Sequence, residues 1–228
     1  MKVDQEVAFD NEARRYIYDL VMNEGLPPTV AETAPALSTT PENVAASFRR
    51  LAEGHILVLQ RGSGEILMAN PFSVVPTPFL VRAGDRCWYG TCIWDEMGIP
   101  AMLKQDATIE ASCGCCGTAM HLAVADSSLE EAFGIVHFAI PAAHWWDDIV
   151  FNPKTMLLFW SEEHVEKWYG DWNLPRGSVL SLDRCWRMAE AWHGPDRREP
   201  EWRRRTVVEA EALFTELGLT SLFWHLSR

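Results

Sequence analysis

Apolar positions in the first eighty residues repeat with the spacing of three helices. One apolar stripe runs through residues 7–23, a short second segment covers 30–37, and a third begins after Thr40, which suits a helix cap. The pattern then changes to two short apolar runs around a glycine-rich turn at 62–64, which predicts a β-hairpin. Three helices followed by a hairpin indicate a winged-helix-like unit over residues 1–78, ending in a proline-rich linker.

Beyond this linker, short strand patterns alternate with helical ones. The predicted strands cover residues 107–111, 119–125, 135–140 and 155–160. The predicted helices cover residues 162–168, 182–193 and 199–217. This alternation predicts an α+β protein, in which residues 79–228 form a mixed β-sheet domain with flanking helices and a C-terminal helical extension.

Charge excludes several classes of partner. The formal net charge is −12, and residues 1–80 hold six lysines and arginines against ten acidic residues. Nucleic acids and anionic membranes bind basic faces, so a packing role is favoured over DNA binding for the first unit. No apolar run approaches the ~20 residues of a membrane helix, and the acidic N-terminus is unlike a secretory leader. We expect a cytoplasmic protein with neither nucleic acid nor membrane as its partner.

Cysteines carry the candidate chemistry, because thiols in a reducing compartment stay free and are typical of metal binding or catalysis. The chain has six of them, at positions 87, 92, 113, 115, 116 and 185. Glycines in the turn at 113–117 let neighbouring thiols converge, which makes Cys115 and Cys116 candidate ligands of a soft metal. Alternatively, both are incidental turn residues. Cys113 is expected to be a buried core cysteine, and His121 or Cys87 would complete a zinc site.

Cys92 and Asp95 form a second candidate pair. Residues three apart lie on one face of a helix, where a carboxylate can exchange a proton with a thiol or with a group bound to sulfur. Such a pair suits a nucleophile with a proton shuttle. The alternative is a buried structural cysteine beside a capping aspartate.

The segment around this pair resembles the active-site segment of the alkylmercury (organomercurial) lyases. In that family, Cys-x-x-Asp is followed by a proline eight residues after the cysteine, as in Cys92, Asp95 and Pro100. Residues 134–141 and 159–163 are similar to the family's later strand and helix entry. The resemblance covers roughly residues 10–190.

This resemblance implies protonolysis of a carbon–mercury bond. Cys92 would capture the organomercurial and Asp95 would relay a proton to the departing carbon, with no cofactor required. The mercuric ion would stay bound as product and pass to small thiols or to a mercury-accepting protein. The family's second thiol is expected within residues 150–156, where this chain has no cysteine, so Cys115 or Cys116 is the expected substitute.

Other functions and partners remain open from the sequence. The scaffold could bind a soft metal (Hg, Cu or Zn) without cleaving a bond, or it could use Cys92 or Asp95 on another thiophilic or organic substrate. Arginines at 197–205 are typical of a solvated or subunit-contact face. The apolar segment at 222–224 is typical of a docking element, so a homodimer is one expectation. His137 is expected to be a core histidine, and residues 144–148 either line a pocket or start a helix.

Overall fold

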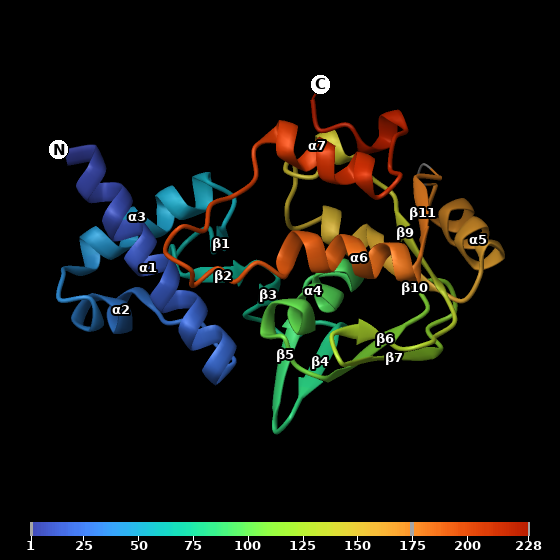
Figure 1. The fold of residues 1–228 in the computed structure, drawn as a ribbon, viewed down its shortest axis with the longest axis horizontal. Helices are drawn as coiled ribbons and strands as arrows, with labels where there is room; N and C mark the ends of the chain where they lie inside the picture. The colour runs from blue at the N-terminus through green and yellow to red at the C-terminus, as the bar shows by residue number, and fades with distance from the viewer. Residues whose placement is uncertain (1, 174–175, 228) are drawn as a thin grey trace. The chain divides into compact units, whose positions relative to one another are not determined.

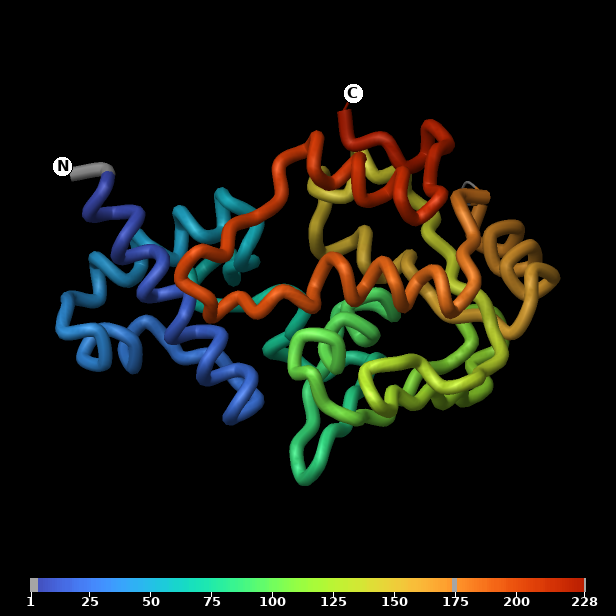
Figure 2. The backbone as a smooth tube through the Cα atoms, viewed as in Figure 1, coloured from blue at the N-terminus to red at the C-terminus, as the bar shows by residue number. Residues whose placement is uncertain are grey.

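The computed structural model describes residues 2–173 and 176–227 and divides into two compact units (Figure 1). Unit 1 comprises Met1–Pro76 and Pro195–Arg204, and unit 2 comprises Thr77–Gly194 and Arg205–Arg228. Along the chain, residues 195–204 follow one helix of unit 2 and precede another, as the continuous trace shows (Figure 2). None of the described helices is long and apolar enough to cross a membrane.

Unit 1 contains the three helices and the hairpin that periodicity predicted. The helices are α1 (Lys2–Glu24), α2 (Val30–Ala36) and α3 (Pro41–Glu53), and the strands are β1 (Leu57–Leu59), β2 (Ile66–Ala69) and β3 (Phe72–Ser73). Thr29 and Thr40 cap α2 and α3 by accepting backbone hydrogen bonds. The apolar stripe of α3 is buried, and α1 packs against this helix.

Residues 195–204 form no helix, so the expectation of one helix over 199–217 was wrong, and Arg197 departs from the expected solvated arginine face. Arg197 is buried, donates a 2.7 Å hydrogen bond to Tyr18 Oη, and lies over the rings of Tyr18 and Trp202. These contacts hold the segment in an irregular conformation. Helix α7 (Val207–Glu216) begins later because Thr206 and Glu209 form a capping box.

Unit 2 contains two antiparallel runs of strands. The first has the order β5-β4-β6-β7-β8, with β4 (Leu80–Ala83), β5 (Arg86–Gly90), β6 (Ala107–Ser112), β7 (Ala119–Ala125) and β8 (Ser128–Leu129). The second has the order β10-β9-β11, with β9 (Ile135–Phe138), β10 (Met156–Phe159) and β11 (Ser178–Ser181). All the ladders described are antiparallel, and the isolated bridge between Cys113 and Leu158 is parallel. The predicted α+β class is confirmed. In the expected mixed sheet, the parallel pairing described is limited to that single bridge.

Helices cover the strands of unit 2. They are α4 (Ile93–Leu103), α5 (Glu162–Trp172), α6 (Leu182–His193) and α7, with short 3-10 segments η1 (Ala142–His144), η2 (Asn152–Thr155) and η3 (Leu222–Trp224). Helix α4 lies alongside α6 and also packs against β5 and β10 (Figure 1). Trp224 of η3 is buried, 5.6 Å from the Phe214 ring, so this part of the expected docking element belongs to the core.

Candidate functional site

Cys92 lies at the junction of β5 and α4, where it is the cap residue of the helix. Its extended backbone lets the sulfur accept a hydrogen bond from the backbone N–H of Asp95, with 3.4 Å between nitrogen and sulfur. Gly90 makes this tight entry possible, because a Cβ there would lie 2.8 Å from the backbone nitrogen of Glu96. The strand-to-helix turn therefore fixes the thiol relative to the first turn of α4.

The thiol of Cys92 is protonated in the resting protein. Cys92 is 1% exposed, and burial raises the pKa of its thiol well above the ordinary value. The negative charge of Asp95 raises the pKa further, whereas the N–H groups of Asp95 and Trp94 oppose this shift. A buried neutral thiol thus lies directly beside a carboxyl group.

The carboxyl group of Asp95 is held from two sides. The hydroxyl of Thr91 donates a hydrogen bond to Oδ2, and Nε2 of His193 lies 3.5 Å from Oδ1. Gly98 allows this approach of α6, because a Cβ there would lie 2.4 Å from the imidazole ring of His193. Sequence reasoning missed Thr91 and His193, although Thr91 directly precedes the recognised cysteine.

Glu96 is a second buried carboxyl group in the first turn of α4. It is fully buried, and neither side-chain oxygen has a hydrogen-bond partner among the described residues. Burial raises the pKa of Glu96 well above its ordinary value, and the charge of Glu110 adds to the shift. The surroundings of Glu96 therefore favour its protonated form.

Aromatic rings surround the same turn of α4. The ring of Trp94 lies 5.2 Å from that of Trp145, 5.4 Å from that of Trp192 and 5.1 Å from that of His193. The indole nitrogen of Trp94 is buried and has no hydrogen-bond partner within the described part of the chain. Apolar surroundings of this kind strengthen the electrostatic interactions of Cys92 and Asp95.

The segment expected to carry a second thiol, residues 150–156, contains two buried polar side chains. Asn152 and Thr155 are each 3% exposed, and the Thr155 hydroxyl donates a 2.8 Å hydrogen bond to the Asn152 carbonyl. The segment forms η2 and leads directly into β10, which packs against α4. These side chains cannot replace a thiolate as ligands of a soft ion.

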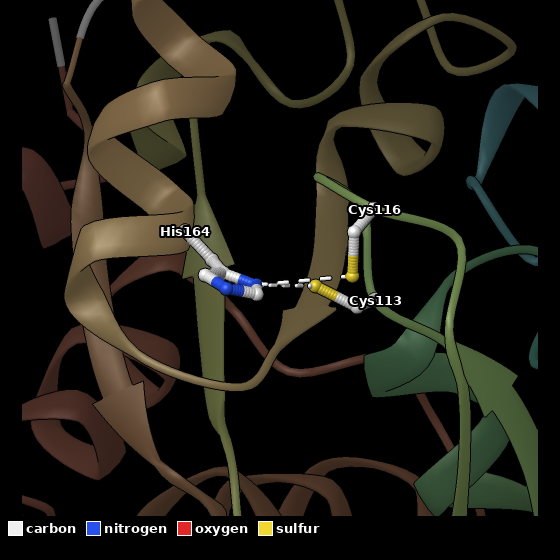
Figure 3. Close-up of side chains that lie close together, drawn as sticks. All are labelled: Cys113, Cys116 and His164. Carbon is white, nitrogen blue, oxygen red and sulfur yellow. Dashed lines mark hydrogen bonds between the residues drawn. The ribbon is translucent and has the colours of Figure 1, made fainter.

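A group of three potential metal ligands lies elsewhere in unit 2. Nδ1 of His164 is 3.2 Å from Sγ of Cys113 and 3.9 Å from Sγ of Cys116 (Figure 3). All three ligand atoms lie within 4.8 Å of one another. Cys113 is therefore not only a core cysteine, as expected, although it is indeed buried.

The structure changes the expected set of metal ligands. Among the described residues, the group includes Cys116 but not Cys115, Cys92 or the suggested partners His121 and Cys87. The side chain and backbone N–H of Thr118 form hydrogen bonds with the Cys116 sulfur and lower the pKa of its thiol. Cys116 is thus the more readily ionised thiol, in contrast to the buried Cys92.

Two further histidines, His137 and His144, lie outside both groups of candidate site residues. His137 is fully buried beside the rings of Phe159 and Trp168, as expected of a core histidine, and burial lowers its pKa. His144, the last residue of η1, forms an exposed hydrogen bond between its Nδ1 and Oδ2 of Asp147 at 2.7 Å. The expectation that residues 144–148 start a helix was wrong, because η1 ends at His144 and residues 145–148 form turns and a bend.

Comparison with known proteins places the chain in a family. The model of the MerB family, alkylmercury lyase, matches residues 72–194, which is more than half of the chain. The crystal structure of the mercury-bound form of MerB2 has a similar fold, with a TM-score of 0.63 and 17% identity over 82% of this chain and 96% of that chain. No curated protein matches. The protein belongs to the alkylmercury lyase family.

Proposed function

We propose that this protein cleaves a carbon–mercury bond by protonolysis, with Cys92 as the mercury-binding thiol and Asp95 as the proton relay. One observation carries the proposal: a buried thiol lies against a carboxylate whose own backbone N–H donates to the sulfur. The thiol can lose its proton only to a nearby base, because burial disfavours an isolated thiolate. Asp95 is that base.

The proposed reaction balances without a cofactor. Asp95 takes the proton of the Cys92 thiol while the sulfur bonds to mercury in an organomercury thiolate. The carbon–mercury bond then breaks, its electron pair stays on carbon, and the proton of Asp95 completes the hydrocarbon. Mercury remains bound to the Cys92 sulfur and to the thiolate that entered as part of the organomercury substrate. Mercury is therefore the substrate and the bound product of the protein.

Thr91 and His193 act as positioning residues in this proposal. The Thr91 hydroxyl fixes one oxygen of Asp95, while the imidazole of His193 lies near the other. A proton relay requires both the thiol and the mercury-bound carbon to lie within hydrogen-bonding reach of one carboxyl group. Holding the carboxyl from two sides excludes many side-chain conformations of Asp95 in which it could not transfer the proton.

In this proposal an external thiol supplies the second sulfur ligand of mercury, because residues 150–156 contain no cysteine. Since Asn152 and Thr155 fill part of this segment, we propose that a small thiol or a thiol of an acceptor protein provides the second sulfur ligand. Cys92 is 1% exposed, so the side chains that cover it must move before the substrate enters. Small neutral organomercurials fit such a buried apolar site better than charged ones.

Hydrocarbon release tests the proposal. Reduced protein incubated with phenylmercury and excess small thiol should release benzene, measured by gas chromatography. C92S and D95N should each lower the rate at least a hundredfold, since each removes a reacting group. Cys87→Ser is the matched control, because it removes one exposed thiol of β5. The proposal fails if the wild-type protein releases no benzene or if C92S retains full activity.

Capture of mercury without cleavage is the second candidate function, favoured by the missing second thiol. It predicts one mercury retained per chain through Cys92, with no hydrocarbon released. Measuring bound mercury and benzene in the same sample separates the two functions. A C92S variant that retains as much mercury as the wild type would contradict both roles of this thiol.

A further inference from the structure

We infer that Cys113, Cys116 and His164 form a zinc site with three protein ligands, separate from the Cys92–Asp95 pair. The two cysteines belong to the turn between β6 and β7, and His164 lies in the first turn of α5 (Figure 3). The inference goes beyond the proposed lyase reaction, which uses none of these three side chains. It stands whether or not the protein cleaves organomercurials.

Backbone hydrogen bonds fix the cysteine turn. The Cys113 N–H donates to the Thr118 carbonyl at 2.9 Å, and the Gly117 N–H donates to the Cys113 carbonyl at 2.8 Å. Gly117 has a φ of 70°, a left-handed conformation that glycine adopts readily, and this closes the turn. The two sulfurs are therefore brought together by a short, hydrogen-bonded loop rather than by flexible segments.

The same strand positions the turn and the histidine. The Gly114 N–H donates a 2.9 Å hydrogen bond to the carbonyl of Leu158 in β10, and Cys113 forms the parallel bridge to the same residue. Ser161, three residues after Leu158, is the N-cap residue of α5, which carries His164, although its side chain makes no capping hydrogen bond. Gly114 has no room for a side chain, because a Cβ would lie 2.8 Å from atoms of Leu157 and Phe159. The ligands are thus arranged before any ion binds.

The distances match the coordination of zinc. Bonds of ~2.3 Å to sulfur and ~2.0–2.1 Å to nitrogen at a tetrahedral angle separate the two ligand atoms by about 3.6 Å. The two sulfur–nitrogen distances here, 3.2 and 3.9 Å, lie on either side of that value. The two sulfur–nitrogen distances therefore need to change by only a few tenths of an ångström, and the two sulfurs lie within 4.8 Å of each other.

The ligand chemistry favours a thiophilic ion with an open position. Two thiolates and one imidazole suit zinc, whereas magnesium and calcium prefer oxygen ligands. Cys113 is buried, His164 is half-buried and Cys116 is exposed, so the site has a dry side and a solvent side. A fourth ligand, such as water, would bind from the solvent side. Binding releases the protons of the two thiols to solvent.

Titration of the reduced, metal-free chain with Zn²⁺ tests the inference, with Co²⁺ as the spectroscopic probe of thiolate ligation. We expect one ion per chain and a thiolate-to-cobalt absorption band. Cys116→Ser and His164→Gln should each weaken zinc binding at least tenfold, and both change residues that are not buried, so folding should persist in circular dichroism. Cys115→Ser is the matched control in the same turn and should bind as the wild type does.

Three outcomes would overturn the site. The wild type could bind less than a tenth of an ion at saturating zinc, C116S and H164Q could bind zinc as tightly as the wild type, or C115S could lose as much affinity as C116S and H164Q. C92S distinguishes the site from the proposed catalytic centre, because zinc binding should persist in this variant while hydrocarbon release is lost. Loss of zinc binding in C92S would contradict two separate sites.

Discussion

Gly98→Ala measures how closely α6 approaches α4 beside Asp95. The new methyl group would lie 2.4 Å from Cδ2, 2.6 Å from Cγ and 2.9 Å from Cβ of His193. Because Cβ is attached to the backbone, rotating the ring cannot relieve every contact. Overpacking of this kind costs about 1–3 kcal/mol, while replacing glycine in a helix gains about 1 kcal/mol. We expect a net loss of stability of up to about 2 kcal/mol.

A double-mutant cycle isolates the contact. In a His193→Ala background the two nearest ring atoms are gone, so Gly98→Ala should cost less there, by about 1 kcal/mol or more. Thermal unfolding followed by tryptophan fluorescence suits the measurement, since Trp94 and Trp192 adjoin the contact. For a chain of this size, 1 kcal/mol corresponds to roughly 2–4 °C in Tm.

Gly170→Ala in α5 is the matched control. A Cβ there meets no atom within 4 Å, so only the helix-propensity gain of up to about 1 kcal/mol should remain. If Gly98→Ala is as stabilising as Gly170→Ala, or if its effect is the same with and without His193, then α6 does not approach α4 as described. The positioning of Asp95 by His193 would then lose its basis.

Three further outcomes follow from the charges around α4 and the cysteine turn. The pKa of Glu96 is raised in the folded chain above its ordinary value of 4.5, so the unfolded chain loses this proton first and stability falls as the pH rises above 4.5. Glu96→Gln should therefore stabilise the protein more at pH 8 than at pH 5 in urea unfolding, and an equal effect at both would contradict the shift. A short iodoacetamide pulse at pH 7 should modify Cys116 before Cys92, because Cys116 is exposed and has a lowered thiol pKa, whereas Cys92 is buried and its thiol pKa is raised; peptide mass spectrometry showing the reverse order would refute this. Thr91→Val should slow hydrocarbon release about tenfold at unchanged Tm, since it removes a hydrogen bond to Asp95, and an unchanged rate would exclude the positioning role.

Local patterns predicted most of the elements because their signals lie within each segment. The strand at 119–125 and the helix at 182–193 have the predicted bounds, since alternation, helical periodicity and a following Gly-Pro pair are all local. The prediction of one helix over 199–217 was wrong for a tertiary reason. Arg197 contacts Trp202 and Tyr18 of α1 within unit 1, and the energy of these contacts outweighs a weak helical preference.

The same difference between local and tertiary information applies to the candidate sites. Cys92 and Asp95 could be paired from the sequence because a single helix turn joins them. Cys113 and Cys116 have two residues between them, a spacing typical of zinc sites, but the sequence interpretation took Cys113 for a core cysteine and missed this signal. His164 and His193 could not be assigned, because their positions depend on the bridge between Cys113 and Leu158 and on the packing of α6 against α4.

The missing thiol has a mechanistic consequence for the proposed reaction. A mercuric ion bound to Cys92 and one external thiolate is attached to the protein through a single sulfur, so one exchange by another thiol releases it. Capture is then weaker than with two protein thiols, while release of the product is easier. The proton-transfer step depends instead on Asp95, whose carboxyl is held by Thr91 and lies beside His193. Turnover should therefore depend steeply on thiol concentration, whereas protonolysis of already bound substrate should not.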